Sequence, residues 1–275
     1  MLNERKVGFI GAGNMAEAMI KGLLQSGASK PENIVASDVR EDRLSFLHEL
    51  FEVSVCEQNP EVVKRADLVV LAVKPQIMES VLIELTNTLD MSKLIISIAA
   101  GISLANIESH LKRDLRLIRA MPNIAALVLE SATAICPGKH ASNEDLKLAK
   151  AIFDSIGKTV IIEEGLMDAI TGLSGSGPAY LFLIIDAMAD AGVKVGLSRD
   201  NALTLSAQTV LGAAKLLIET GEHPGRLKDL VTSPGGTAIA GLHTLEEGGL
   251  RTTLINAVEI ATRRSRELGE MMEKK

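Results

Sequence analysis

The sequence predicts an α/β fold in two parts: a mostly parallel β-sheet with flanking helices, followed by an all-α part. Two observations carry this prediction. Short runs rich in Val, Ile and Leu alternate with helical stretches as far as Glu163-Glu164-Gly165, a pattern typical of βαβ units. Beyond that point no segment has the pattern of a strand, and long helical segments follow. We therefore expect two domains, spanning residues 1–163 and 164–275.

The strands of the N-terminal part are expected at Lys6–Ile10, Asn33–Ser37, Val53–Val55, Asp67–Ala72, Leu94–Ser97 and Leu115–Arg119, with two more at Thr133–Cys136 and Thr159–Ile162. Helices are expected between strands at Asn14–Ser26, Arg40–Phe51 and Gln76–Leu89. The run Leu68–Val73 shows no alternation of apolar and polar residues. Such a run is typical of a strand that is buried on both faces of a parallel sheet.

The helices of the C-terminal part are expected at Pro178–Val193, Asp200–Thr220, about Ala238–Glu246 and Leu250–Met271, with a break at Gly221–Gly225. The first of them is apolar on most of its surface, so it must be buried. A domain of about 110 residues has little room to bury such a helix alone. A dimer interface is therefore favoured, and the alternative is a central helix of a compact bundle.

Composition excludes several classes of protein. Aromatic residues make up only 2% of the 275 residues and the net charge is −6, which disfavours nucleic-acid binding. No apolar run approaches the length of a membrane span, and the start of the chain leaves no room for a signal peptide, so we expect a cytoplasmic protein. Cys56 and Cys136 are expected to be reduced thiols, and the scattered histidines predict no metal site.

A glycine-rich loop follows the first expected strand. Gly11, Ala12, Gly13, Asn14, Met15 and Ala16 form a G-x-G-x-x-A motif between a strand and a helix. In this context Gly11 permits the tight turn, Gly13 allows a pyrophosphate to approach the backbone, and Ala16 keeps the helix close to the strand. The helix N-terminus supplies free N–H groups for phosphate. The motif predicts a Rossmann-like dinucleotide-binding domain.

The choice between NAD and NADP stays open at the end of the second strand. Asp38 would accept a hydrogen bond from a ribose 2′-hydroxyl and repel a 2′-phosphate, which favours NAD. Ser37, Arg40 and Arg43 lie beside it and could hold a 2′-phosphate, although the two arginines also fit a solvated helix start.

Two further loops leave the carboxyl ends of strands, where ligands bind in such sheets. Ala72-Val73-Lys74-Pro75 follows the fourth strand, and Lys74 either faces the cofactor or lies on the surface. Ala99-Ala100-Gly101 follows the fifth strand and would form a small, flat wall for a nicotinamide ring. Asn123 follows the sixth strand and could donate to the carboxamide or the substrate.

Two segments of the helical part carry features of a binding site. Gly172–Tyr180 lies at the start of the apolar helix and contains several glycines. It fits either an anion site or an ordinary N-cap with Pro178 in the first turn. In Val231–Thr237, Pro234-Gly235 fits a type II turn. Ser233, Thr237 and the N–H groups of Gly235 and Gly236 would also form a concave site for a small carboxylate.

The helical part lacks the acid or base that alcohol chemistry needs. β-Hydroxyacid dehydrogenases carry a catalytic Lys about one turn after a glycine-rich helix start, whereas Pro178–Phe182 contains no Lys. A substrate that needs no strong enzymic acid fits better, such as a cyclic imine that is protonated in solution. A non-catalytic dinucleotide sensor is a further alternative, although the intact Ser233–Thr237 turn speaks against it.

The sequence resembles the pyrroline-5-carboxylate reductase family over essentially its whole length. The motifs that carry the resemblance are Gly8–Gly13, Ala72–Pro75, Ala99–Gly101, Gly172–Tyr180, His223-Pro224-Gly225, Ser233–Thr237 and Leu245-Glu246. The resemblance implies reduction of 1-pyrroline-5-carboxylate to L-proline by NADPH or NADH, with a slight preference for NADP. It also implies a cytosolic homodimer that assembles into a decamer through the helical domain.

The resemblance further implies which residues bind each ligand. Gly11–Met15, Asp38, Asn59, Ala72–Pro75 and Ala99–Gly101 would line the cofactor, and Ser233, Gly235, Gly236 and Thr237 would hold the substrate carboxylate. Many family members have a Thr that bonds the ring nitrogen where this chain has Ala238. Either Thr237 or water takes that contact, with Thr237 as the candidate catalytic residue, or the proton comes wholly from solvent.

Overall fold

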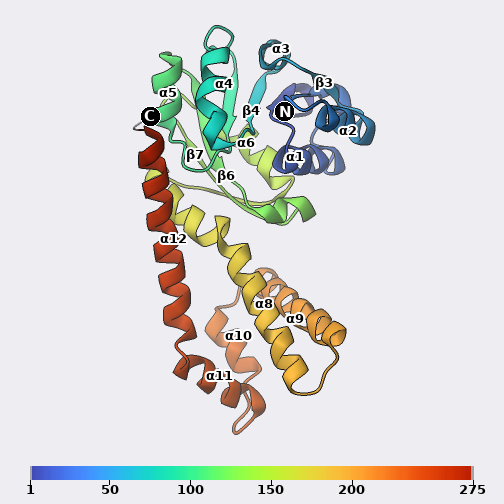
Figure 1. Cartoon of the computed structure of the whole chain (residues 1–275), viewed down its shortest axis with the longest axis vertical. Helices are drawn as coiled ribbons and strands as arrows, with labels where there is room; N and C mark the ends of the chain where they lie inside the picture. Colours follow the sequence, from blue (N-terminus) through green and yellow to red (C-terminus); the bar gives the residue numbers. More distant parts are fainter. Residues whose placement is uncertain (1, 274–275) are drawn as a thin grey trace. The chain divides into compact units, whose positions relative to one another are not determined.

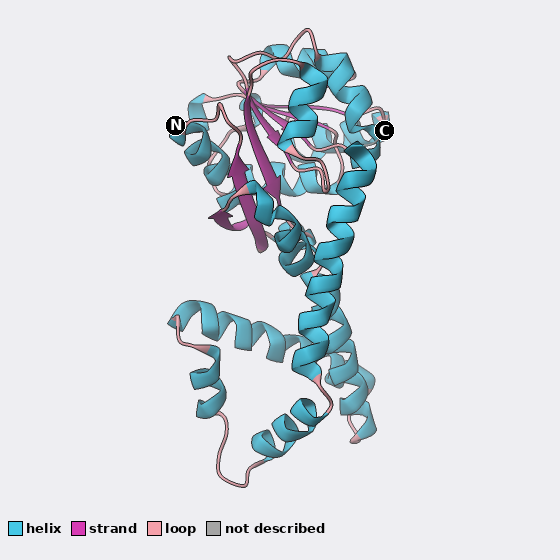
Figure 2. Ribbon diagram, turned by 90° about the vertical axis from the view of Figure 1, so that its left-hand side faces the viewer, coloured by secondary structure: helices cyan, strands magenta, loops and turns pink. Residues whose placement is uncertain are grey.

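The structure is a computed structural model that describes residues 2–273 (Figure 1). Its internal contacts divide the chain into two compact units. The first unit contains the residues up to Ser176 together with those from Ile260 onward, and the second unit contains Gly177–Glu259. Within the described residues, strands occur only in the first unit (Figure 2).

The first unit is built on one sheet with the strand order β3-β2-β1-β4-β5-β6-β7-β8. Its strands are β1 (Val7–Ile10), β2 (Ile34–Ser37), β3 (Ser54–Cys56), β4 (Leu68–Leu71), β5 (Leu94–Ser97), β6 (Arg116–Met121), β7 (Ser131–Pro137) and β8 (Gly157–Ile161). Each expected strand is present, with small shifts at the ends. The direction in which successive strands are added to the sheet reverses between β1 and β4. Ligands bind at such a reversal point, beside the carboxyl ends of the strands.

One strand pair departs from the expected parallel pattern. β6 and β7 are antiparallel, with Met121 opposite Ala134, while every other neighbouring pair is parallel. Only a short 3₁₀ turn, η4 (Ile124–Val128), lies between β6 and β7. A parallel pair needs a crossover of a dozen or more residues, so this connection permits only the antiparallel arrangement.

The helices of the first unit cover both faces of the sheet. They are α1 (Asn14–Gln25), α2 (Glu41–Phe51), α3 (Asn59–Arg65), α4 (Met78–Leu85), α5 (Leu104–Leu111), α6 (Asn143–Asp154) and α7 (Met167–Ile170). Short turns of other helix types lie at η1 (Leu2–Glu4), η2 (Pro31–Asn33), η3 (Pro75–Ile77), η5 (Glu164–Leu166) and η6 (Thr171–Gly175), of which the last is a π-helix. The helix expected at Gln76–Leu89 is therefore shorter, because its first turn is 3₁₀ and it ends at Leu85.

Two apolar clusters form the core, one on each face of the sheet. Phe9 of β1 belongs to the cluster that packs on α1 and α6, and its neighbour Ile10 belongs to the cluster with α4 and α5. Gly8 lets α3 approach β1, because a Cβ at Gly8 would lie 2.5 Å from a Val62 methyl group. This packing fixes the carboxyl end of β1, from which the glycine-rich loop leaves.

The second unit is all-α, as the sequence predicts. It contains α8 (Gly177–Lys194), α9 (Arg199–Thr220), α10 (Pro224–Leu230) and α11 (Thr237–Glu247), and α12 (Leu250–Glu273) begins there and ends in the first unit. The break expected at Gly221–Gly225 is shorter than predicted, because Pro224 occupies the first turn of α10 and His223 caps it. Among residues 2–273, no helix is long and apolar enough to cross a membrane.

Most large apolar side chains of the second unit are exposed in the single chain. On α8 only Ala189 is buried, whereas Phe182 is 64% exposed and Leu183 is 70% exposed. Exposed apolar side chains continue on the other long helices of this unit, at Leu203, Leu205, Leu211, Leu216, Ile218 and Ile255. An apolar surface of this extent is typical of a protein interface. The bundle alternative is therefore wrong for the single chain, because the unit does not bury α8.

Candidate active site

The glycine-rich loop has the geometry that the motif predicts. Gly11 has a φ of +98°, and a Cβ at this position would lie 2.8 Å from the Ala72 carbonyl oxygen. Gly13 precedes α1 with a φ of −74° and no side-chain cap, and nothing lies within 4 Å of a Cβ built there. Gly11 therefore serves the turn itself, while the space beside Gly13 and the uncapped helix start is open to a phosphate.

Asp38 holds the loop in place. Its Oδ2 atom accepts a hydrogen bond of 2.7 Å from the Ala12 N–H, and its Oδ1 atom accepts one of 3.0 Å from the Arg40 N–H. Arg43 supports the same loop, because its Nε donates to the Ala12 carbonyl oxygen at 2.9 Å and its Nη2 pairs with Glu17 at 2.7 Å. Arg43 is thus committed to the fold, whereas the Arg40 side chain is 54% exposed.

Ser37 and Asn59 form a polar chain at the carboxyl end of β2. The buried Ser37 hydroxyl donates to Asn59 Oδ1 at 2.7 Å, and Asn59 Nδ2 donates to Glu84 Oε2 at 2.7 Å. Ser37 therefore orients Asn59 rather than facing solvent. Ser37 directly precedes Asp38. The Ser37–Asn59 pair therefore lies beside the residue that holds the glycine-rich loop.

The loops Ala72–Pro75 and Ala99–Gly101 follow the neighbouring strands β4 and β5. Lys74 and Ala100 are exposed, and Gly101 has a φ of +74°. A hollow of about 380 Å³ lies beside both loops, within the first unit. It is lined by Pro75, Gln76, Ala100, Gly101, Thr171, Ser176, Ala261, Arg264, Ser265, Leu268 and Met272. The predicted residues Pro75, Ala100 and Gly101, which come from the two loops, therefore line the same hollow.

Ser176, from the predicted segment Gly172–Tyr180, also lines this hollow, but sequence reasoning missed its remaining wall residues. Thr171 lies in the π-helical turn, and Arg264 and Ser265 lie on α12, far along the chain from either loop. Ser265 is anchored by a hydrogen bond of 2.6 Å to Asp168 Oδ1. No local pattern marks Arg264 and Ser265, because only the packing of the C-terminal part of α12 within the first unit brings them to the loops.

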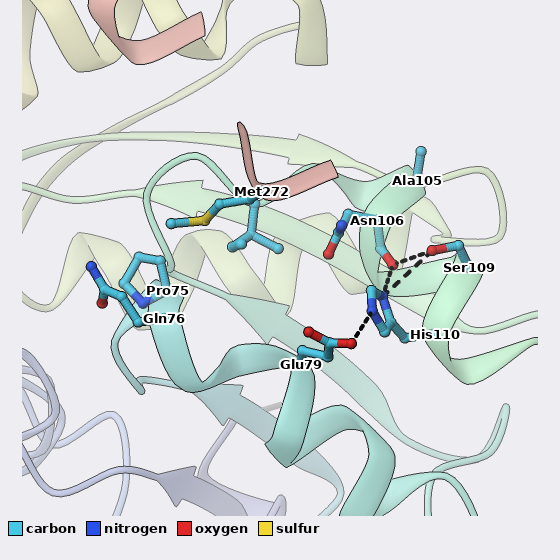
Figure 3. Close-up of a pocket in the computed structure, with 9 residues that line it drawn as sticks. Pro75, Gln76, Glu79, Ala105, Asn106, Ser109, His110 and Met272 are labelled. Carbon is cyan, nitrogen blue, oxygen red and sulfur yellow. Dashed lines mark hydrogen bonds and ion pairs between the residues drawn. The ribbon is translucent and has the colours of Figure 1, made fainter. Parts of the chain in front are cut away.

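A second hollow, of about 490 Å³, lies between α4 and α5 and shares Pro75, Gln76 and Met272 with the first (Figure 3). Glu79 and His110 face each other in it, with 3.7 Å between Glu79 Oε1 and His110 Nε2. His110 Nδ1 lies 2.8 Å from the Asn106 carbonyl oxygen. The imidazole is therefore bonded at Nδ1 within α5 and faces the Glu79 carboxylate of α4 at Nε2.

Asn123 takes part in the fold rather than in an open site. Its Nδ2 donates to the Ser174 carbonyl oxygen at 2.9 Å, and its Oδ1 accepts from the Ala125 N–H at 3.2 Å. The side chain is buried. These contacts do not place Asn123 in a ligand site, and its role as a donor to the carboxamide or substrate stays a prediction.

The two cysteines are thiols without a disulfide bond. Burial, followed by the charge of Glu164, raises the pKa of Cys136 to about 11. Burial also raises the pKa of Cys56. Neither is therefore an activated nucleophile. No group of three or more His, Cys, Asp or Glu side chains in the described range 2–273 is placed to hold a metal ion.

The Ser233–Thr237 segment of the second unit is the turn that the sequence predicts. The Gly236 N–H donates to the Ser233 carbonyl oxygen at 3.0 Å, and Gly235 has a φ of +66°, as a type II turn requires. A Cβ at Gly236 would lie 2.2 Å from Ser233 Oγ. α11 begins at Thr237 without a side-chain cap, so its first N–H groups are available to an anion.

Two family models match the chain. The model for pyrroline-5-carboxylate reductase dimerisation matches residues 164–268, and the model for coenzyme F420-dependent NADP oxidoreductases matches residues 6–101.

Among curated proteins, the chain is 52% identical over 269 residues to a pyrroline-5-carboxylate reductase of Methanosarcina acetivorans, covering 98% of this chain and 100% of the relative. It is 48% identical to the enzyme of that name from Arabidopsis thaliana, covering 96% of each.

Solved structures give the same result. A pyrroline-5-carboxylate reductase from Coxiella burnetii has a TM-score of 0.93 and 37% identity, covering 97% of this chain and 99% of that one. A pyrroline carboxylate reductase from Plasmodium falciparum, solved with NADP bound, has a TM-score of 0.86 and 34% identity, covering 98% and 100%.

Proposed function

The chain belongs to the pyrroline-5-carboxylate reductase family, and on this premise we propose that it reduces 1-pyrroline-5-carboxylate to L-proline, the final step of proline biosynthesis. It is an NAD(P)H-dependent oxidoreductase acting on the CH–NH group. The observation that carries the proposal is the similarity to reductases of this name over nearly the whole chain. The open space at Gly13 and the uncapped start of α1 fit the dinucleotide that this reaction needs.

We propose that residues 1–163 form the dinucleotide-binding domain and residues 164–275 the substrate and dimerisation domain. The dimerisation model, which begins at residue 164, supports this boundary. The end of the sheet also supports this boundary, since no described strand follows β8, whereas the compact units divide later, after Ser176, and residues from Ile260 onward belong to the first unit.

The cofactor is NADPH, with NADH as a second donor, and it supplies the hydride when bound. The proposed binding residues are Gly11, Ala12, Gly13, Asn14, Met15, Ser37, Asp38, Arg40, Asn59, Ala72, Val73, Lys74, Pro75, Ala99, Ala100 and Gly101. N–H groups at the start of α1 bind the pyrophosphate. Arg40, exposed beside Asp38, is the residue best placed to hold a 2′-phosphate. Ala99–Gly101 form the wall for the nicotinamide ring.

Ser233, Gly235, Gly236 and Thr237 are the proposed substrate residues. The turn and the uncapped start of α11 present N–H groups and hydroxyls to a carboxylate. The substrate needs no strong acid, because a cyclic imine takes its proton from solution. Thr237 either contacts the ring nitrogen or binds only the carboxylate. Catalysis rests mainly on positioning, for which well-oriented reactants gain roughly 7–11 kcal/mol.

We further propose a cytoplasmic homodimer that assembles into a decamer. The dimerisation model at residues 164–268 and the exposed apolar side chains of α8 and α9 support an interface in the helical part. The substrate is a small molecule, and neither nucleic acid nor membrane is an expected partner.

The test is consumption of NADPH and NADH with pyrroline-5-carboxylate as substrate, with proline identified as the product. A panel of β-hydroxyacids in the reverse direction is the control for the rival dehydrogenase activity. Proline formation that depends on both substrate and cofactor is the expected result. Cofactor binding without turnover of pyrroline-5-carboxylate would contradict the proposal.

A further inference from the structure

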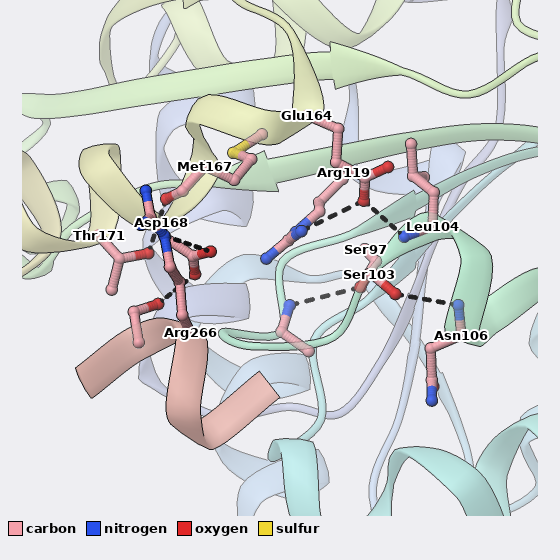
Figure 4. Close-up of polar contacts among 12 residues, drawn as sticks. Ser97, Ser103, Leu104, Asn106, Arg119, Glu164, Met167, Asp168, Thr171 and Arg266 are labelled. Carbon is pink, nitrogen blue, oxygen red and sulfur yellow. Dashed lines mark hydrogen bonds and ion pairs between the residues drawn. The ribbon is translucent and has the colours of Figure 1, made fainter. Parts of the chain in front are cut away.

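Glu164 joins three segments that are distant in the sequence. It is the first residue of η5, and Ile162 and Glu163 separate it from β8, the last strand in the chain order. Its Oε1 atom accepts a hydrogen bond of 2.7 Å from the Leu104 N–H and one of 3.2 Å from Arg119 Nη1 (Figure 4). One carboxylate oxygen therefore connects the start of α5, the strand β6 and the segment that leads to the helical part.

The contact with Leu104 caps α5 from a distance. Leu104 is the first residue of α5, and the first N–H groups of a helix have no partner within it. Ser103 caps the next part of the turn, since its Oγ accepts from the Asn106 N–H at 3.1 Å. A carboxylate also suits the positive end of the helix dipole. The start of α5 is thus fixed by a local side chain and by Glu164.

The loop between β5 and α5 contains Ala99–Gly101, the proposed wall for the nicotinamide ring. At its β5 end, the Ile98 N–H donates to the Leu71 carbonyl oxygen at 3.2 Å. At its α5 end, Glu164 holds the Leu104 N–H. On its outer side, α12 comes so close that a Cβ at Gly269 would lie 3.3 Å from the Gly101 carbonyl oxygen. The loop is therefore held at both ends.

Arg119 fixes the direction of the Glu164 carboxylate. Arg119 is 8% exposed and lies on β6, paired in register with Ser97, the last residue of β5. The guanidinium is therefore attached to a strand of the sheet, next to the strand that leads into the loop. It compensates the charge of Glu164, whose side chain is 34% exposed. Because Arg119 donates to the Glu164 carboxylate, it orients the oxygen that accepts from the Leu104 N–H at the start of α5.

We propose that Glu164 is a positioning residue for hydride transfer, which it supports by holding the Leu104 N–H and so the Ala99–Gly101 wall in place. The inference rests on the proposed reductase activity. Glu164 touches the backbone of the loop's end, so its effect should be on the orientation of the nicotinamide ring. Binding of the adenosine and pyrophosphate, which Gly11–Gly13 serve, should change little.

The first test compares Glu164→Ala with Glu164→Gln in the full-length protein. Glu164→Ala should lower kcat about tenfold or more, because small errors in orientation are costly, while the Kd for NADPH changes less than about threefold. Glu164→Gln keeps an oxygen that accepts from Leu104, so it should recover most of kcat. Glu163→Ala, which removes the exposed neighbouring carboxylate, is the matched control and should behave as wild type.

A second pair of variants tests the Leu104 N–H donor separately from the side chain. Leu104→Pro deletes the N–H at the first position of α5, where Pro is tolerated, and the Ser103 backbone (φ −77°, ψ 159°) already fits a residue before Pro. Leu104→Ala also shortens the side chain but keeps the N–H. Leu104→Pro should lose kcat as Glu164→Ala does, and Leu104→Ala should lose much less. This pair keeps the Glu164–Arg119 contact, so it tests the proposal even if Glu164→Ala does not fold.

Three results would overturn the proposal. One is a wild-type kcat in Glu164→Ala. Another is equal kcat loss in Glu164→Gln and Glu164→Ala, which would assign the effect to the charge beside Arg119. The third is equal behaviour of Leu104→Pro and Leu104→Ala. If the wild-type enzyme itself does not reduce pyrroline-5-carboxylate, the proposed function fails instead. Hydrogen exchange of residues 98–104 with NADPH bound then still tests the loop, with faster exchange expected in Glu164→Ala.

Discussion

At the scale of single residues, the two glycines of the loop have different tasks. Gly11 adopts a left-handed backbone conformation and touches the chain beyond β4, whereas Gly13 has an ordinary conformation and an open neighbourhood. The motif predicts both residues, but only the structure separates their roles. Asp38 holds the loop by accepting hydrogen bonds from the N–H groups of Ala12 and Arg40. The sequence does not reveal the contact with Ala12, because the two residues lie 26 positions apart.

Gly11→Ala and Gly13→Ala should therefore fail in different ways. Gly11→Ala forces a strained φ and a clash with Ala72, so the free energy of unfolding should fall by about 1–3 kcal/mol. Gly13→Ala should leave that free energy within about 0.5 kcal/mol of wild type. It should nevertheless raise the Kd for NADPH about tenfold, because the added methyl group occupies the approach of the pyrophosphate. Urea denaturation and cofactor titration measure the two effects, and a Gly13→Ala protein that binds NADPH normally would contradict the assignment.

Arg40→Ala should separate the two cofactors. If Arg40 holds the 2′-phosphate, its loss should lower kcat/KM for NADPH by about tenfold or more, since a hydrogen bond to a charged group contributes about 1.5–3 kcal/mol. The value for NADH should change little, because NADH lacks that phosphate. Equal loss with both cofactors would show that Arg40 acts instead through its side-chain contact with Asp38, where Nε lies 3.4 Å from Oδ1, and through the loop.

Thr237→Ala tests the proton and substrate contacts. A fall in kcat of about 10²-fold or more would place the hydroxyl on charge that develops in the transition state. A rise in KM with kcat little changed would assign it to the carboxylate alone. We expect one of these two results. Thr244→Ala, which removes a hydroxyl bonded only within α11, is the control. Wild-type kinetics in Thr237→Ala would remove this residue from the site.

At the scale of elements, the sequence predicts long or strongly patterned segments and misses short ones. α3 has 7 residues with Pro60 in its first turn, and α5 has 8 residues, so neither shows enough turns for an apolar period. α6 is an exception: it has 12 residues and is absent from the predicted helices, although the capping box of Ser142 and Asp145 marks its start. Glu164 and Arg119 show no signal at all, because their partners come from other elements and depend on the finished sheet.

Asp145 joins α6 to the sheet, and its substitution should weaken that joint. Its carboxylate is fully buried and accepts from Arg116 on β6 and from Ser142. Asp145→Asn should lower the free energy of unfolding at pH 7 by about 2 kcal/mol. This is less than for a fully buried pair, because the Arg116 side chain is 28% exposed.

The same carboxylate predicts a pH dependence. Burial raises the pKa of Asp145, but the hydrogen bonds from Arg116 and Ser142 together outweigh burial, so the pKa lies below its ordinary value of 3.8. A carboxyl whose folded-state pKa is lowered stabilises the fold above its unfolded value, and this contribution is lost as the pH falls through the folded pKa. The difference between wild type and Asp145→Asn should therefore shrink below pH 3.8. A constant difference from neutral to acid pH would contradict this role.

At the scale of the whole molecule, the sequence predicts the α/β fold and the all-α second part. Its expectation of a dimer rests on α8, which is apolar on most of its surface, and the structure leaves that helix largely exposed in one chain. Pattern alone cannot tell an interface helix from a core helix, because both bury their apolar side chains. Exposure in the folded chain separates them.

Leu183→Glu should shift the protein toward monomers. Leu183 is 70% exposed on α8, and a charge buried at its place in an interface should weaken association about 10²-fold or more. Leu50→Glu on α2 is the control, since Leu50 is also exposed, at 55%, but lies on the first unit. Sedimentation at several protein concentrations measures the change. Identical association of wild type and Leu183→Glu would exclude this part of α8 from the interface.

The most direct test of the central claim follows the hydride itself. NADPH carrying deuterium at the transferable C4 position is incubated with the protein and pyrroline-5-carboxylate, and the product is analysed by mass spectrometry and NMR. The account predicts proline with a single deuterium on Cδ, the former imine carbon. Proline without deuterium, or no proline despite cofactor binding, would contradict it.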